Sequence, residues 1–349
     1  MILLLKKEAP EGADRELLRA AARLGVPAKI LTGNWGRQAV ELEEPIPGRA
    51  QRMLAASPLV EEILGRPSSH PLADGEDGEV RPVQVGDVIF GGDELVLAAG
   101  PCAVETEEQV EQAAVAAARA GAKVLRGGAY KPRTRPADFQ GHGTPALRWL
   151  RAAADRHGLL VVTEALDERS CAEVAEWADI IQIGARTMQA TALLKQAAVA
   201  GRPVLLKRAL SATVEEWLSA AEYLLDGGAP GVILCERGSR SFETATRFSL
   251  DVGAIAAARL RTHLPIVADP SHPAGRRALV RPLARAAIAA GADGLLVEAH
   301  PDPSCARCDG PQALLLEELP QLAQEMTAIG AAVGRTFPPV RASRVAAGS

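Results

Sequence analysis

The sequence predicts an α/β protein: a (β/α)8 TIM barrel that follows a small ferredoxin-like α+β domain. From residue 94 onwards, eight short apolar runs alternate with longer stretches of helical periodicity, a pattern typical of buried parallel strands joined by crossovers. Residues 1–65 instead carry shorter segments in the order β-α-β-β-α-β, the ferredoxin-like order. A doubly wound sheet is the alternative for the larger region, but no G-x-G-x-x-G loop follows its first strand.

Length and composition agree with this fold class and exclude several others. The 349 residues accommodate one large barrel and one modest extra domain, and 48% hydrophobic residues suffice for a real core. A net charge of −4 argues against a general nucleic-acid surface, and no apolar run approaches the roughly 20 residues of a membrane helix. Five cysteines do not suggest a disulfide framework, so we expect a reduced, cytoplasmic protein.

The small domain is predicted element by element from residues 1–65. Strands are expected at residues 1–6, 27–33, 37–45 and 60–66, and helices at 13–25 and 49–57. We expect residues 66–93 to be a linker, because PSSHPLADGEDGEVRP is rich in turn formers and acids. The barrel is then expected over residues 94–335, and residues 336–349 are expected to be a disordered tail.

The barrel strands are the eight apolar runs. They are expected at residues 94–102, 123–128, 159–165, 179–186, 203–208, 231–237, 265–272 and 293–300. The stretches between them, such as EEQVEQAAVAAARAG and TVEEWLSAAEYLLDGG, have the apolar spacing of amphipathic helices.

Chemically functional side chains gather where these strands end. The groups are Cys102, Arg126, Glu164, Arg186, Lys207 with Arg208, Glu236 with Arg237, Asp269 with His272, and Glu298 with His300. Active sites of such barrels lie at the C-terminal ends of the strands. The placement therefore predicts a site at that rim.

Six cations form the first group at this rim: Arg126, Lys131, Arg133, Arg186, Lys207 and Arg237. Three of them lie in the single stretch LRGGAYKPRT, residues 125–134. Arginine suits forked contact with phosphate or carboxylate, so the group indicates anionic ligands. Any one of these cations, taken alone, could equally pair with a neighbouring carboxylate or extend to solvent.

Cys102, His272, Glu298 and Asp309 form a second group, which would suit a divalent metal ion. Taken singly, Cys102 could be a small buried apolar residue and His272 could cap the next helix. The C-x-x-C pair Cys305 and Cys308 is a weak indication of a zinc or redox site, because no second pair accompanies it. We interpret it as an incidental loop pair, although its closeness to Asp309 leaves room for metal interference or oxidation sensitivity.

Several motifs in one order resemble those of a known family. AGPCAVE, VLRGGAYKPRT, FQGHG, VVTEA, IQIGAR, PVLLKR, VILCERG, VADPSHPAGRR and VEAHPDP…DGPQ are similar to motifs of 3-deoxy-D-arabino-heptulosonate-7-phosphate (DAHP) synthases. Their order and spacing resemble the type I beta subgroup, which has an N-terminal ferredoxin-like domain. The resemblance covers about residues 1–335 and is strongest over 98–312.

The resemblance implies a metal-dependent condensation of phosphoenolpyruvate with erythrose 4-phosphate, the first step of the shikimate pathway to aromatic amino acids. It implies one divalent ion (Mn, Fe, Co or Zn) on Cys102, His272, Glu298 and Asp309. It places Arg126, Lys131, Arg186, Lys207 and Arg237 at phosphoenolpyruvate, and Arg133 and Thr134 at the aldose phosphate. Glu164 and Ala185 are also expected to bind substrate. Lys131, Cys102 and His272 would be catalytic, with Lys131 as the candidate for proton delivery. Glu164 and Asp269 could position water or support the metal ligands.

A near relative, 3-deoxy-D-manno-octulosonate-8-phosphate synthase, uses arabinose 5-phosphate on the same barrel. That family carries an Asn-Arg-Ser-type stretch where this chain has Lys131-Pro132-Arg133-Thr134, which favours the four-carbon sugar. The chain departs from the resembled pattern at Ala103, where Ser is common, and at Thr187, where Asn is frequent. Neither position matches a metal ligand.

Two other functions remain open from the sequence alone: a Schiff-base aldolase with Lys207 as nucleophile, and a non-catalytic binding protein that keeps only the fold. The resemblance also implies a homo-oligomer, a tetramer or dimer, and feedback control through residues 1–65 by an aromatic amino acid, with tyrosine expected. No nucleic-acid or membrane partner is expected.

Overall fold

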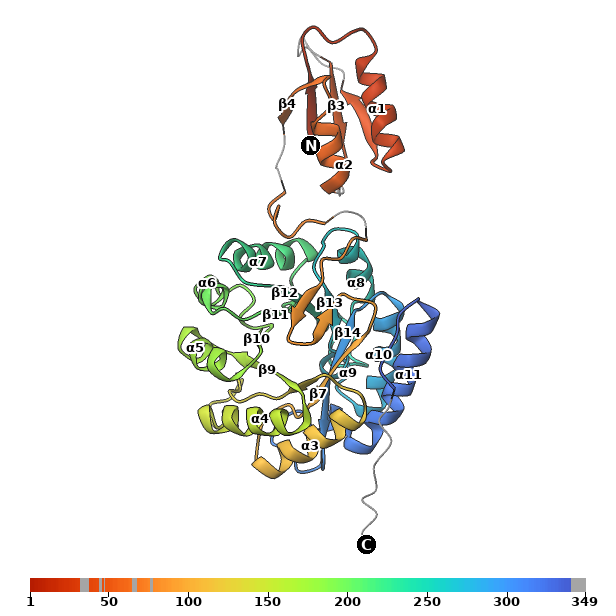
Figure 1. The fold of residues 1–349 in the computed structure, drawn as a ribbon. Helices are drawn as coiled ribbons and strands as arrows, with labels where there is room; N and C mark the ends of the chain where they lie inside the picture. Colours follow the sequence, from red (N-terminus) through yellow and green to blue (C-terminus); the bar gives the residue numbers. More distant parts are fainter. Residues whose placement is uncertain (32–37, 44–45, 47, 65–67, 76–77, 340–349) are drawn as a thin grey trace. The chain divides into compact units, whose positions relative to one another are not determined.

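The computed structural model describes residues 1–31, 38–43, 46, 48–64, 68–75 and 78–339. The chain forms two compact units. One comprises Met1–Glu79 with Arg259–His263, and the other contains the remaining described residues. The second unit is a closed parallel barrel and the first is a small α+β unit (Figure 1). The predicted fold class is therefore confirmed.

The first unit has the predicted β-α-β-β-α-β order. Its elements are β1 (Ile2–Leu5), α1 (Ala13–Arg23), β2 (Ala28–Leu31), β3 (Ala39–Leu42), α2 (Gly48–Ala55) and β4 (Val60–Leu64). The strands form one antiparallel sheet in the order β2-β3-β1-β4. Leu17 of α1 and Leu54 of α2 pack on Leu3, Leu5 and Val40, because alternate strand residues share one face of the sheet. Positions 32–33, 37, 44–45 and 65–66 of the predicted strands lie outside the described residues.

Eight parallel strands form the barrel. They are β7 (Val96–Gly100), β8 (Val124–Arg126), β9 (Leu160–Ala165), β10 (Ile180–Ile183), β11 (Val204–Lys207), β12 (Val232–Glu236), β13 (Ile266–Ala268) and β14 (Gly294–His300). Each pairs with the next along the chain, and β14 also pairs with β7, which closes the sheet. All eight predicted strands are confirmed, because burial on both faces gives near-continuous apolar runs.

Helices surround this barrel (Figure 1). They are α3 (Glu107–Arg119), α4 (Thr144–His157), α5 (Glu168–Trp177), α6 (Thr191–Val199), α7 (Val214–Asp226), α8 (Val252–Arg259), α10 (Arg277–Ala289) and α11 (Leu319–Ala332). The short helix α9 (Ser271–Ala274) follows the C-terminal end of β13. Thr106, Asp167 and Thr213 cap α3, α5 and α7 by accepting a backbone N–H bond in the first turn. These caps fix where three helices begin after the functional ends of the strands. Among the described residues, no helix is long and apolar enough to cross a membrane.

The expected linker over residues 66–93 is wrong for its second half. Residues 83–90 form an antiparallel hairpin of β5 (Val83–Val85) and β6 (Val88–Phe90). Val83, Val88 and Phe90 are buried in one apolar cluster with Val124 of β8 and Val162 of β9. The hairpin therefore belongs to the barrel, because its inward side chains complete the barrel core.

The expected boundary at residue 335 also needs correction. Thr336 bridges to Glu94, and its carbonyl accepts a 2.7 Å hydrogen bond from the Leu95 N–H. Phe337 is buried. Residues 336 and 337 are therefore part of the barrel unit, and positions 340–349 of the expected tail lie outside the described residues.

We predict that Phe90→Ala destabilises the barrel by about 3–5 kcal/mol, because the truncation leaves a cavity in its core. Urea unfolding followed by tryptophan fluorescence measures this change. Ile89→Ala is the matched control, since Ile89 lies on the same hairpin and is 46% exposed; its effect should stay within about 0.5 kcal/mol. Equal effects of the two substitutions would show that the hairpin does not support the core.

Candidate active site

A cavity of about 430 Å³ lies at the C-terminal ends of the barrel strands. Nine of the site residues predicted from the sequence line it: Lys131, Arg133, Thr134, Glu164, Ala185, Arg186, Arg237, His272 and Asp309. Parallel strands bring their carboxyl ends to one rim, so residues far apart in the sequence meet there. The structure thus brings most of the predicted site into one cavity.

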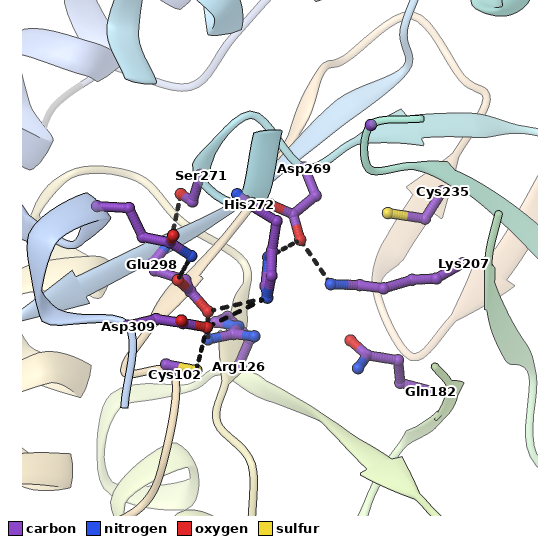
Figure 2. A network of polar contacts seen from close by, with 12 residues as sticks. Cys102, Arg126, Gln182, Lys207, Cys235, Asp269, Ser271, His272, Glu298 and Asp309 are labelled. Atoms are coloured by element: carbon purple, nitrogen blue, oxygen red, sulfur yellow. Dashed lines mark hydrogen bonds and ion pairs between the residues drawn. The ribbon is translucent and has the colours of Figure 1, made fainter. Parts of the chain in front are cut away.

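Cys102, His272, Glu298 and Asp309 converge at one edge of this cavity (Figure 2). One potential ligand atom from each lies within 4.8 Å of all the others. The Cys102 Sγ is 3.4 Å from the Asp309 Oδ2, and the His272 Nε2 is 3.5 Å from the Glu298 Oε1. A thiol, an imidazole and two carboxylates at such spacings fit around one divalent ion with bonds of about 2.0–2.3 Å.

Asp269 fixes the orientation of His272. The imidazole Nδ1 lies 2.6 Å from the Asp269 Oδ2, so the proton assigned to Nδ1 leaves the Nε2 lone pair facing the other three groups. Burial is the main cause that lowers the pKa of His272, although the Asp269 charge opposes it. The imidazole is therefore neutral at neutral pH, as a metal ligand requires.

Glu298 is a buried carboxylate with two polar partners besides His272. Gln312 donates a 2.6 Å hydrogen bond to its Oε2, and the Arg126 guanidinium lies 3.4 Å from its Oε1. Burial, followed by the nearby Cys102 sulfur, raises the pKa of Glu298 to about 7. A bound cation would reverse this effect, because it favours the charged carboxylate.

Asp309 holds an uncommon backbone conformation. Its φ is 53°, which makes it the one described non-glycine residue with a positive φ, and aspartate tolerates this region better than most residues. Its carboxylate accepts a 2.9 Å hydrogen bond from Arg247. Burial disfavours the charged form, but His272 and Arg247 outweigh it and lower the pKa of Asp309 to about 2. Asp309 is therefore an anion at neutral pH.

Lys131 lies against Cys102. Its Nζ donates to the Cys102 carbonyl at 3.0 Å and lies 3.1 Å from the Cys102 Sγ. Gly128 permits this position, since a Cβ there would come within 2.6 Å of the Lys131 side chain. The hydrogen bond with Cys308, followed by burial, raises the pKa of Cys102 well above its ordinary value. Metal binding would therefore have to displace the Cys102 proton.

The six predicted cations divide into two sets. Lys131, Arg133, Arg186 and Arg237 line the cavity. Arg126 and Lys207 are buried outside its lining, and each pairs with a carboxylate: Arg126 with Glu298, and Lys207 with Asp269 at 2.5 Å. The second set therefore balances buried negative charge around the cluster.

Arg237 is the cation that most clearly faces the cavity without a protein anion. Its guanidinium lies 5.0 Å from the Phe248 ring centroid, and its buried Nη1 has no hydrogen-bond partner among the described residues. Buried donors in folded proteins almost always have a partner. An anionic ligand in this cavity would supply one.

Several polar residues at the site escaped the sequence prediction, among them Arg247 and Gln312, and Cys308 was interpreted only as part of an incidental loop pair. Arg247 bonds both Asp309 and Gln312, and Cys308 lies 3.2 Å from Cys102. The DGPQ motif contains Gln312, but its contact with Glu298 needed the three-dimensional fold. Of the C-x-x-C pair, Cys308 reaches the site and Cys305 is exposed.

We predict that Glu298→Gln stabilises the metal-free protein more at about pH 8 than at about pH 5, by on the order of 2 kcal/mol. The raised pKa of Glu298 in the folded state gives stability that is present below its unfolded pKa and is lost as the pH rises through 7. Glutamine mimics the protonated form and escapes this loss. Urea unfolding at both pH values, after chelator treatment, measures the difference; a pH-independent effect would contradict it.

Comparison with known proteins gives the site its context. Among curated proteins, the chain is 52% identical over 252 residues to a phospho-2-dehydro-3-deoxyheptonate aldolase of Thermotoga maritima, covering 72% of this chain and 75% of the relative. It is 35% identical over 262 residues to a 2-dehydro-3-deoxyphosphooctonate aldolase of Nitratidesulfovibrio vulgaris, covering 67% of this chain and 91% of the relative.

Solved structures agree. A phospho-2-dehydro-3-deoxyheptonate aldolase (DAHP synthase) from Thermotoga maritima matches with a TM-score of 0.75 and 41% identity, over 97% of this chain and 98% of that one. A truncated form of the 3-deoxy-D-arabino-heptulosonate 7-phosphate synthase from the same organism matches with a TM-score of 0.72 and 47% identity, over 77% of this chain and all of that one. The DAHP synthetase I family matches residues 73–333, which include every residue of the cavity and of the cluster beside it. The chain therefore belongs to the DAHP synthetase I family.

Proposed function

We propose that the chain is a DAHP synthase, which condenses phosphoenolpyruvate with erythrose 4-phosphate and releases inorganic phosphate. The observation that carries this proposal is that the segment Lys131-Pro132-Arg133-Thr134 lines the same cavity as His272 and Asp309. This segment distinguishes the four-carbon from the five-carbon aldose in the motif comparison. The higher identity to the heptonate aldolase than to the octonate aldolase supports the same choice.

A divalent ion fits the cluster of Cys102, His272, Glu298 and Asp309, both by donor chemistry and by spacing. When bound there, the ion would act as a Lewis acid on the aldehyde carbonyl of the sugar. Asp269 keeps the His272 Nε2 directed at this position, and Arg247 and Gln312 hold the two carboxylates. The identity of the ion is left among Mn, Fe, Co and Zn.

The cavity cations bind the two anionic substrates and offset their repulsion. Arg186 and Arg237 line the cavity with Glu164 and Ala185 and would hold the carboxylate and phosphate of phosphoenolpyruvate. Arg133 and Thr134 would hold the aldose phosphate. Fixed cations in a partly dry site lower the activation barrier because they hold the two substrates in reactive positions. Their charges are already oriented, so the site need not reorganise during the reaction.

Lys131 is our candidate for proton delivery. In the condensation, the phosphoenolpyruvate C3 forms a bond to the aldehyde carbon, and the aldehyde oxygen becomes an alkoxide that must be protonated. Lys131 lines the cavity beside Cys102. Burial lowers the pKa of Lys131, but its interactions with Cys102, Cys308 and Glu164 outweigh burial and raise the pKa above the ordinary value. The ammonium form, which carries the proton to be delivered, is therefore the resting form. Water then adds at C2, and C–O cleavage releases phosphate.

The Schiff-base alternative finds little support. Lys207 would need a free amine facing the substrate, but its Nζ is 2.5 Å from the Asp269 Oδ2 and it is outside the cavity lining. Borohydride treatment in the presence of substrates should therefore trap no adduct on Lys207.

The decisive test measures phosphate release from phosphoenolpyruvate with erythrose 4-phosphate or arabinose 5-phosphate, with and without added metal. We expect turnover with erythrose 4-phosphate that chelation abolishes and Mn²⁺ or Zn²⁺ restores, because the bound ion would supply the Lewis acid for the aldehyde carbonyl. Equal rates with both sugars would contradict the substrate assignment. Full activity after exhaustive chelation would contradict the metal assignment.

Arg133→Ala should raise the KM for erythrose 4-phosphate about ten- to a hundredfold, as expected for a lost charged hydrogen bond of about 1.5–3 kcal/mol. The KM for phosphoenolpyruvate should change little. Arg135→Ala is the matched control, because Arg135 is exposed and outside the cavity lining. If phosphoenolpyruvate binding weakened instead, the division of the cations between the two substrates would be reversed.

We further propose that the unit formed by β1–β4 and its helices is regulatory, and that an aromatic amino acid, with tyrosine expected, inhibits a tetrameric or dimeric enzyme through it. Residues 1–65 have a core separate from that of the barrel, which supports a separate role. We also propose a cytoplasmic location, which five free cysteines support.

Deleting residues 1–65 should leave condensation activity intact and remove inhibition by millimolar tyrosine. The truncated relative of known structure spans 77% of this chain, so a barrel without this unit is a reasonable test object. Steady-state rates with tyrosine and phenylalanine measure the effect, and analytical ultracentrifugation gives the oligomeric state. If both amino acids leave the full chain unaffected, the regulatory assignment fails.

A further inference from the structure

Two thiols meet beside the proposed metal position. The Cys102 Sγ and the Cys308 Sγ are 3.2 Å apart although 206 residues separate them in the sequence. Both side chains are buried and neither forms a disulfide. They share a small apolar cluster with Ala103 and Phe139, so the protein holds the two sulfurs together from two different loops.

Small molecules can reach one of these sulfurs. Cys308 lines the cavity, whereas Cys102 is 3% exposed and outside the lining. Cys305 lies in the same loop, but it is exposed and its thiol donates to the Asp302 carbonyl. A small oxidant that enters the cavity can therefore reach the Cys308 sulfur first. The Cys102 sulfur is in contact with the Cys308 sulfur but does not line the cavity.

We propose that Cys102 and Cys308 are a reversible oxidation site, at which a hydroperoxide forms a disulfide in competition with metal binding. This inference rests on the proposed function, because it takes Cys102 as a metal ligand. Hydrogen peroxide oxidises the Cys308 thiol to a sulfenic acid and is itself reduced to water. The Cys102 sulfur then attacks the Cys308 sulfur, the S–O bond breaks, and a second water leaves. A dithiol reductant reverses the reaction by exchange.

The geometry makes the two states exclusive. A disulfide has an S–S distance of about 2.05 Å, so the sulfurs must approach each other by about 1.2 Å. Once bonded to Cys308, the Cys102 sulfur has no thiolate to offer a metal ion. Conversely, a metal-bound Cys102 is not free to attack. Cys308 directly precedes Asp309, so the new bond would also restrain a second proposed ligand.

The test uses the full chain, reduced and chelated, and then treated with a small excess of hydrogen peroxide. Peptide mapping under non-reducing conditions should find the peptides of Cys102 and Cys308 joined, with the loss of two hydrogen atoms. Binding of added Zn²⁺, measured by elemental analysis after desalting, should fall from one equivalent per chain to none, and dithiothreitol should restore it. Loading with Zn²⁺ beforehand should slow disulfide formation at least about tenfold, because only the metal-free fraction reacts.

Two matched variants decide the assignment. Cys308→Ser should form no such cross-link and should keep its zinc binding after the same treatment, whereas Cys305→Ser should behave as the unchanged chain does. A Cys305–Cys308 pair, no cross-link at all, or equal zinc loss in Cys308→Ser would overturn the proposal. If the reduced chain binds no zinc and shows no turnover while the Cys102–Cys308 cross-link still forms, the proposed metal function fails and the thiol pairing stands alone.

Discussion

The pairing of the last barrel strand with the first is the constraint on which the site depends. In the β14–β7 ladder, Glu298 stands opposite Gly100, and Cys102 follows two residues later. A side chain at position 100 would meet the Arg126 carbonyl, since a Cβ there would lie 2.1 Å from that oxygen. Glycine at this position therefore lets β7 and β8 approach closely. Closure of the barrel thus brings a thiol from the start of the sheet to a carboxylate at its end.

A second constraint is the balance of charge inside the barrel mouth. Asp269, Glu298 and Asp309 bring negative charge into a region with little solvent, which is costly unless each is paired. Lys207, Arg126 and Arg247 lie within ion-pair distance of them in that order. For Glu298 the nearby positive charge does not outweigh the cost of burial, and its pKa is raised. A divalent ion bound at the cluster would supply the positive charge that the Glu298 carboxylate lacks. The cluster is therefore suited to binding a cation.

The sequence predicts the barrel well because its signals are local. Each strand is a continuous apolar run, each ends in a polar group, and the topology places all eight ends at one rim. The same reasoning found Cys102, His272 and Glu298 of the cluster, whereas Asp309 lies in the loop after the last barrel strand. It could not separate Lys131 and Arg237, which line the cavity, from Arg126 and Lys207, which do not, because this depends on how deep each side chain lies. It interpreted Cys308 as incidental and missed Arg247, since loop conformation directs both side chains, including the left-handed backbone at Asp309.

The hairpin was missed for a different reason. Val83–Val85 and Val88–Phe90 are only three residues each, so their alternation is too short to outweigh the turn formers around them. Yet Phe90 closes the core of the barrel. The hairpin comes before the first barrel strand, in the segment that follows the small domain. If the small domain were lost or exchanged during evolution, the enzyme would keep its barrel core only if the chain were cut before Val83. The independently folding barrel is therefore longer than its eight strands suggest.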